Sequence, residues 1–396
     1  MQETTLRQDN TNRIRTLQAA RFLFILLIYL SHSVEPLAHS PFDFGGEGGV
    51  AFFFVLSGFV LSYGYGPRVS RGEFDGKRFF WKHFWHLYPL HLLFFSATVA
   101  LDYRLGVSYD ALQIVTSLLL VQTWIPSDHT LFVANGVSWF LCDTLFCYIV
   151  FAWLYKWLTS IRTSRLAIGM TVLAAVYACL ALQVPDRMTN CTLYSNPLLR
   201  AIDFSLGIIA YRFYKTFPSV RKQPRLFPYV DVALLLAVYA LYQIMCPQIR
   251  CSMLFWPVMP LIVVRLATAD ASEGWATRLL QSKPMSWLGS VSFEIFIAHL
   301  LVIRIVQHIV GYNGSEKLAA INLAVSIVST ILVAEALRRW FVKPVTDVIN
   351  RRLLRYTQLY IHNGNIRTHP HRPTENIRHP RQPYRGGKSA PCAFQH

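Results

Sequence analysis

Long hydrophobic runs alternate with short polar segments along most of the chain. Eleven of these runs approach the length, about 17 to 24 residues, at which a helix crosses the hydrocarbon core of a bilayer. They cover residues 17–34, 47–65, 84–101, 110–125, 137–158, 165–184, 199–214, 227–246, 251–268, 289–310 and 318–341. The pattern predicts an all-α, polytopic integral membrane protein.

The charges of the polar segments indicate which side of the membrane each one faces. Arg and Lys gather at residues 7–15, 68–82, 212–225 and 338–355, which places these segments and both termini in the cytoplasm. Residues 35–46 carry acids but no Lys or Arg and are expected outside. Because two cytoplasmic termini require an even number of crossings, we expect about ten transmembrane helices.

The conflict between eleven runs and an even count falls on residues 84–125. We expect one of the two hydrophobic runs in this stretch not to cross the membrane. His86, Pro89 and His91 lie there, and they favour a broken or re-entrant helix that faces protein or water rather than lipid.

Composition agrees with a membrane protein. The 396 residues are 53% hydrophobic and only 15% charged, whereas soluble proteins carry about 25% charged residues. This excludes a large soluble enzyme, an intrinsically disordered protein and a collagen-like fibre. The net charge of +17 would suggest nucleic acid in a soluble protein, but here the basic residues flank hydrophobic runs, where anionic lipid headgroups account for them. We therefore expect membrane lipids, and no nucleic acid, as partners.

The chain divides into three parts. Residues 1–16 form a cytoplasmic segment, residues 17–345 a transmembrane domain and residues 346–396 a basic cytoplasmic tail. From about residue 358 the tail is rich in His, Pro, Arg, Asn and Gly, so it buries too little apolar surface to fold and is expected to be largely disordered. No spacing of Cys and His makes a convincing metal site, and no metal is expected.

Ionisable residues inside hydrophobic runs are costly and mark candidate functional sites. Arg21 and His32 lie eleven residues apart in the first run. On a helix this spacing returns to within about 20° of the same face and rises about 16 Å. Both side chains therefore point the same way, Arg21 in the cytoplasmic half and His32 near the outer end. The alternative is an interfacial Arg that snorkels and a His at the headgroups.

Basic and aromatic residues are interleaved in residues 77–91. Cations at a cytoplasmic membrane face suit the phosphate oxygens of a nucleotide or of CoA, and the rings could stack on a base. The candidate ligands are Arg78, Lys82, His83 and His86. The alternative is a cytoplasmic anchor with an aromatic belt.

Further ionisable residues lie in the later runs. They are Asp143, Arg200, Asp203, Glu294 and His299. In a ten-helix topology, Asp143, Arg200 and Asp203 lie near the outer face, and His299 lies near the middle of the membrane. Each is either a functional group or a polar group that a neighbouring helix satisfies.

Several short motifs follow one another over residues 12–345. They are Arg21-x10-His32, Gly49-Val50-x-Phe52-Phe53-Phe54-Val55-Leu56-Ser57-Gly58-Phe59, a basic cluster that ends in Leu87-Tyr88-Pro89-Leu90, Ser138-Trp139, and Ser286-Trp287-Leu288-Gly289-x3-Phe293-Glu294-x4-His299. In this order they resemble the acyltransferase family 3 membrane proteins, which are bacterial O-acyltransferases of surface glycans and related substrates. Each motif alone is weak, whereas the combination is specific.

The resemblance implies about ten helices in the bacterial cytoplasmic (inner) membrane. It implies transfer of an acyl group, usually acetyl, from cytoplasmic acyl-CoA to a hydroxyl of a lipid-linked or surface glycan, with Arg21 and His32 as the essential pair. Two departures stand out. His83-Phe84-Trp85-His86 replaces the family's Arg-x-x-Arg, and Thr144 occupies the position of a family Glu, with Asp143 as the nearest acid.

Acyl transfer to a hydroxyl needs a base, a polarised thioester carbonyl and exclusion of water. We expect His32 to be the base, since imidazole titrates near neutral pH, and Arg21 to line the route of the pantetheine arm or orient the thioester. The expected acceptor-side residues are Trp139, Asp143, Arg200 and His299. The alternative class is a secondary transporter or flippase of a glycan or small polar substrate, which would use the same buried charges.

Overall fold

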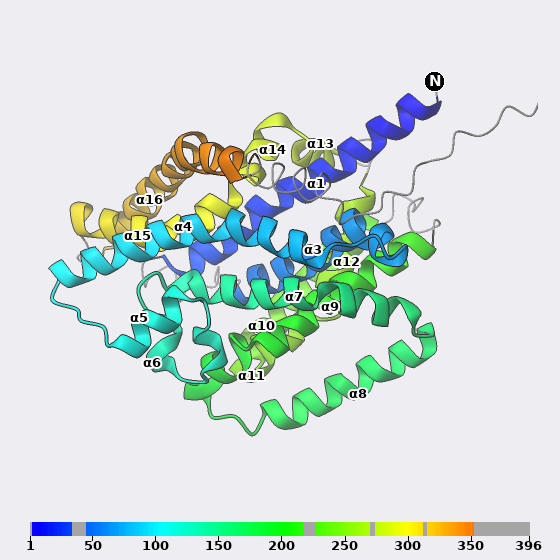
Figure 1. Ribbon diagram of the computed structural model, residues 1–396, viewed down its shortest axis with the longest axis horizontal. Helices are drawn as coiled ribbons and strands as arrows, with labels where there is room; N and C mark the ends of the chain where they lie inside the picture. The colour runs from blue at the N-terminus through cyan, green and yellow to red at the C-terminus, as the bar shows by residue number, and fades with distance from the viewer. Residues whose placement is uncertain are drawn as a thin grey trace, which may run out of the picture. The chain divides into compact units, whose positions relative to one another are not determined.

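The computed structural model describes residues 2–33, 45–217, 227–269, 274–311, 315–349 and 351, with the backbone alone described for residues 2–14 and 227–235. The described residues are helical and contain no strand, as the all-α prediction requires (Figure 1). The longer helices are α1 (Gln2–Ser31), α3 (Gly46–Ser70), α4 (Gly76–Arg104), α7 (Trp139–Ser160), α8 (Thr163–Ala181), α9 (Pro197–Thr216), α10 (Phe227–Ile244), α12 (Met259–Thr268), α15 (Ser292–Val310) and α16 (Glu316–Leu337).

Short helices connect the longer ones. They are α5 (Ala111–Leu118), α6 (Asp128–Leu131), α11 (Pro247–Arg250), α13 (Trp275–Leu280) and α14 (Lys283–Ser290), together with the 3-10 turns Gln122–Trp124, Gly136–Ser138, Asp186–Met188 and Met253–Phe255 and the π-helical turns Asn190–Tyr194 and Arg338–Val342.

Six helices of the described part are long and apolar enough to cross a membrane. They span Gly46–Ser70, Gly76–Arg104, Gly136–Ser160, Thr163–Ala181, Ser292–Val310 and Glu316–Ile349. Four further predicted runs contain α1, α9, α10 and α12, which do not belong to these six. The described helices are therefore consistent with a membrane protein, while the count of ten crossings and the sides of the termini stay predictions.

The hydrophobic run 110–125 does not form a spanning helix. Its helix α5 has eight residues, which rise about 12 Å, whereas a bilayer core is about 30 Å thick. Two side chains of α4 hold the C-terminal end of α5: His91 Nε2 lies 3.1 Å from the carbonyl oxygen of Ser117, and the hydroxyl of Tyr88 donates to that of Leu118 at 3.2 Å. The structure thus supports one non-crossing run in this stretch.

The expected break near Pro89 is wrong, because α4 continues through this residue for 29 residues. A proline removes one backbone hydrogen bond from a helix. The remaining bonds of a long helix that packs on α7 and α15 outweigh that loss. His86, Pro89 and His91 therefore lie on one unbroken helix.

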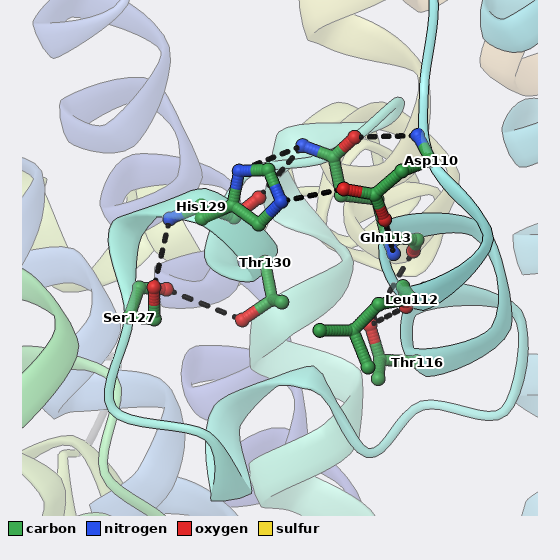
Figure 2. A network of polar contacts seen from close by, with 7 residues as sticks. All are labelled: Asp110, Leu112, Gln113, Thr116, Ser127, His129 and Thr130. Atoms are coloured by element: carbon green, nitrogen blue, oxygen red, sulfur yellow. Dashed lines mark hydrogen bonds and ion pairs between the residues drawn. The ribbon is translucent and has the colours of Figure 1, made fainter.

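The start of α5 is held by a polar network (Figure 2). Asp110 caps the helix by accepting from the backbone N–H of Gln113 at 2.9 Å, and the Gln113 side chain accepts from the Asp110 N–H at 2.9 Å. His129 on α6 places Nε2 2.6 Å from the Asp110 carboxylate, and its carbonyl accepts from Gln113 Nε2 at 2.9 Å. The network ties α5 to α6.

Two glycines bring the backbones of α3 and α9 together at the centre of the core. A Cβ on Gly58 would lie 2.0 Å from the carbonyl oxygen of Phe204, and a Cβ on Gly207 would lie 1.9 Å from that of Val55. Small residues of this kind permit the close helix contacts that membrane proteins favour. Helix α1 packs against α3 on one side and against α14 and α15 on another, which brings the first and last helices of the domain into one bundle (Figure 1).

The contacts divide the chain into residues 1–349 and 350–396. Of the second unit only residue 351 is described. The predicted disorder beyond residue 358 therefore lies outside the described residues.

Candidate active site

Helix α1 positions the predicted pair of Arg21 and His32. The helix runs to Ser31, so His32 follows directly at its C-terminal end, and its side chain is exposed. Arg21 lines a cavity within the bundle. Arg21 therefore lies within one continuous helix, and His32 directly follows its last residue.

His32 contacts a second histidine from the other end of the chain. Nδ1 of His32 lies 3.4 Å from Nε2 of His299 on α15, and the ring centroids are 5.1 Å apart. His299 is fully buried. Sequence reasoning proposed both residues separately, but nothing in the spacing of positions 267 residues apart indicates this contact.

The hydrogen bonds of the pair indicate where the protons lie. Nδ1 of His299 is 2.6 Å from the carbonyl oxygen of Phe296, and Nδ1 of His32 is 2.8 Å from that of Ile28. Since a carbonyl oxygen only accepts, both Nδ1 atoms carry the proton in the neutral rings. Nε2 of His299 is then an acceptor toward His32. Nε2 of His32 keeps a lone pair and makes no hydrogen bond with the described residues.

A cavity of about 480 Å³ lies between α1, α3, α4, α7 and α15. Most of its lining is apolar. Its polar lining includes Gln18, Arg21, Ser57, His83, His86, Thr144, Tyr148 and Ser292. A mostly apolar pocket of this size with a few polar groups is typical of a small-molecule site.

Arg21 makes no ion pair with the described residues. Its Nε is buried and has no hydrogen-bond partner among them. Glu294 on α15 attracts the guanidinium electrostatically, but the two groups are too far apart for a salt bridge. The guanidinium thus borders the cavity with a buried Nε that has no partner among the described residues, and such a group can bind an anionic or carbonyl oxygen.

Two of the four predicted donor-binding residues line this cavity and two do not. His83 and His86 lie on its wall, with the His83 ring 5.0 Å from Tyr148 and the His86 ring 6.1 Å from Phe293. Arg78 and Lys82 are exposed on the first two turns of the same helix and are absent from the cavity wall. The histidines that replace the family's arginines therefore occupy the cavity.

Thr144, which stands where the family has a Glu, lines the cavity, whereas Asp143 does not. Consecutive helical residues point about 100° apart, so the neighbouring acid faces another direction. Asp143 is fully buried, and neither carboxylate oxygen has a hydrogen-bond partner among the described residues. A shift of the family's carboxylate by one position thus does not deliver it to the cavity.

Arg200 and Trp139 are buried in a separate polar cluster. Arg200 Nη1 pairs with Asp203 at 2.7 Å, and its Nη2 donates to the carbonyl oxygen of Cys251 at 3.3 Å. The guanidinium lies between the rings of Phe54 and Tyr194, at 5.9 and 5.6 Å. Trp139 also packs on Tyr194, with centroids 4.8 Å apart.

The same cluster continues through Asp203. Its Oδ1 accepts from Trp256 Nε1 at 2.7 Å and from the hydroxyl of Ser252 at 3.2 Å. Arg200, Asp203 and Trp256 do not line the cavity. Sequence reasoning noted that Arg200 and Asp203 are close in the chain, and their i, i+3 spacing was the signal for this internal pair.

Comparison with known proteins agrees with the motifs. A model of the acyltransferase domain of family 3 matches residues 14–339. Acyltransferase MdmB of Streptomyces mycarofaciens is 27% identical over 376 residues, an alignment that covers 86% of this chain and 93% of that protein. No solved structure matches the chain. The protein belongs to acyltransferase family 3, and it is an acyltransferase with membrane-spanning helices.

Proposed function

We propose that the protein is a multi-pass enzyme of the bacterial inner membrane that moves an acetyl group from cytoplasmic acetyl-CoA to a hydroxyl of a lipid-linked or surface glycan. The observation that carries the proposal is the state of His32. Its Nδ1 is held by Ile28 and His299, while its Nε2 has no partner among the described residues. This is the arrangement that a general base requires.

The cavity suits the donor. Its apolar wall, which includes Leu56, Phe59 and Leu87, matches a pantetheine arm and a short acyl group. Arg21 offers an unpaired guanidinium to the thioester carbonyl or to a phosphate oxygen. His83 and His86 extend this polar part of the wall.

The proposed reaction uses His32 as the general base. Nε2 of His32 accepts the proton of the acceptor hydroxyl as that oxygen attacks the thioester carbonyl carbon. The tetrahedral oxyanion then collapses, the carbon–sulfur bond breaks, and the CoA thiolate leaves with the proton returned from Nε2. The product is an O-acetyl ester and free CoA. A base of this kind contributes about 10² to 10⁴ in rate.

His299 acts through His32 in this scheme. Its Nε2 accepts from Nδ1 of His32, which keeps the lone pair on Nε2. The sequence predicts His299 as an acceptor-binding residue, but its full burial against His32 favours the role of a positioning residue instead.

The proposal is tested with membranes that contain the full-length protein, radiolabelled acetyl-CoA and a crude surface-glycan fraction. The expected result is alkali-labile label on the glycan that depends on acetyl-CoA. Heat-treated membranes and membranes without the protein are the controls. Movement of glycan across the membrane without consumption of acetyl-CoA would instead establish the transporter or flippase.

A further inference from the structure

The cavity and the two histidines are separate in the structure. Neither His32 nor His299 lines the cavity, although the proposed reaction needs the acyl group at His32. Phe296 is the residue that touches both regions. Its side chain lines the cavity, its carbonyl oxygen accepts from His299 Nδ1 at 2.6 Å, and its ring lies 5.9 Å from that of His299.

Two further rings join Phe296 at this end of the cavity. Phe140 on α7 has its centroid 5.0 Å from that of Phe296 and 6.4 Å from that of Phe53 on α3. All three rings line the cavity. We call Phe53, Phe140 and Phe296 the aromatic partition. It is contributed by three helices, and Phe140 lies at its centre.

The position of the partition fixes what it meets. The polar lining of the cavity includes Arg21 and His86, and the rise along α1 separates Arg21 from His32 by about 16 Å. Because Phe296 joins the cavity to His299, an acyl group that passes from the cavity toward His32 meets the three rings. Close-packed aromatic rings leave space for a short acyl group and collide with a long one.

We infer that the aromatic partition sets the length of the acyl group that the enzyme accepts, with Phe140 as the principal specificity-determining residue. The inference rests on the proposed acyl-CoA donor. Excluding or admitting a methylene in such a pocket changes discrimination by roughly tenfold or more. Shortening Phe140 is therefore expected to extend the accepted chain rather than only to weaken binding.

The test is displacement of radiolabelled acetyl-CoA from the full-length protein in membranes by unlabelled acetyl-, butyryl- and hexanoyl-CoA. The variants are Phe140→Ala and Phe140→Leu. Phe140→Leu removes less volume, and it tests the role of Phe140 in chain-length preference if Phe140→Ala does not fold. Phe146→Leu is the matched control, because Phe146 lies on α7 like Phe140 but packs on Trp124 with ring centroids 5.1 Å apart and does not line the cavity.

The wild type is expected to bind acetyl-CoA at least about tenfold more tightly than hexanoyl-CoA. Phe140→Ala should reduce this preference about tenfold, Phe140→Leu should reduce it less, and Phe146→Leu should leave it unchanged. An unchanged preference in both Phe140 variants that still bind acetyl-CoA would overturn the inference alone. Failure of the wild type to bind any acyl-CoA would overturn the proposed donor and the inference with it.

Discussion

Two groups of buried charges lie within one helical bundle, and they differ in what their partners are. Around Arg200, the guanidinium pairs with Asp203, which also accepts from Trp256 and Ser252. Around α1, Arg21 has no ion pair among the described residues, and Nε2 of His32 has no hydrogen bond among them. The first guanidinium is ion-paired within the fold, whereas the second borders a cavity and has no ion pair among the described residues.

Comparing the two groups indicates how structural charges can be separated from functional charges in a membrane protein. Burial alone does not separate them, because Arg200 and His299 are both fully buried. The test is whether the side chain's partners are supplied by the protein and whether the group borders a cavity or solvent. Arg21 borders the cavity and His32 is exposed, whereas Arg200 does neither.

The largest expected effect on stability comes from breaking the Arg200 pair. Arg200→Met leaves Asp203 as a buried carboxylate without its cation, which costs about 3–5 kcal/mol in the free energy of unfolding. The double variant Arg200→Met/Asp203→Leu should recover much of this loss. Denaturation of the detergent-solubilised protein measures both. Equal stability of Arg200→Met and wild type would show that the pair is not structural.

A smaller effect is expected at the positioning histidine. His299→Phe removes the second acceptor of His32 Nδ1, beside the carbonyl oxygen of Ile28, and should lower kcat about tenfold, since base catalysis as a whole contributes about 10² to 10⁴. KM for acetyl-CoA should not change, because His299 does not line the cavity. His299→Gln, whose amide oxygen can accept, should restore part of kcat. A loss confined to KM would contradict the positioning role.

The spacing of Arg21 and His32 in the sequence was enough to place one within α1 and the other at its C-terminal end, while their catalytic role stays a proposal. It could not place His299 beside His32, since that contact depends on how α15 packs on α1. The run 110–125 shows a different limit of composition. Its apolar residues, such as Leu112 and Val115, are exposed on a short helix. The run therefore resembles a membrane span in composition, but its capped helix is too short to cross a membrane.

The phase of α7 was also beyond the sequence. Asp143 was the natural substitute for the family's Glu by proximity in the chain, but only Thr144 reaches the cavity wall. Which of two adjacent residues faces a cavity depends on the rotation of the helix, and tertiary packing sets that rotation. Arg200 and Asp203, by contrast, are neighbours on the helix surface at any rotation.

Removing the charge of Arg21 should separate binding from stability. Arg21→Met is expected to raise the Kd for acetyl-CoA about tenfold, which corresponds to about 1.4 kcal/mol. The free energy of unfolding should stay the same or increase, because the substitution removes a buried cation without an ion-pair partner among the described residues. A loss of stability as large as that of Arg200→Met would place Arg21 in the structural group.

The smallest effect is expected at the polar network around α5 (Figure 2). The hydrogen bond from the Gln113 backbone N–H, together with that from His129, lowers the pKa of the Asp110 carboxyl. Because the pKa is lowered in the folded state, the charged cap stabilises α5 fully at pH values above the ordinary aspartate pKa of about 3.9. This stabilisation is lost as the pH falls through the lowered pKa. The protection of the amides of residues 111–118, measured relative to the exchange rate of an unstructured peptide at the same pH, should therefore fall only in acid.

Asp110→Asn is the control for that prediction. An asparagine still caps the helix but does not titrate, so the protection of the α5 amides against exchange should lose its acid dependence. Acid dependence that persists in Asp110→Asn would assign it to another group.

The role of His32 is tested most directly by the rate of acetyl transfer from radiolabelled acetyl-CoA to glycan. This rate is compared between His32→Ala, the wild type and the surface control His129→Ala at equal amounts of folded protein. We expect the transfer rate of His32→Ala to fall by a factor of about 10² to 10⁴ while acetyl-CoA binding is retained. The transfer rate of His129→Ala should not fall. Transfer by His32→Ala within a few-fold of wild type would contradict the claim that the free Nε2 of His32 is the base.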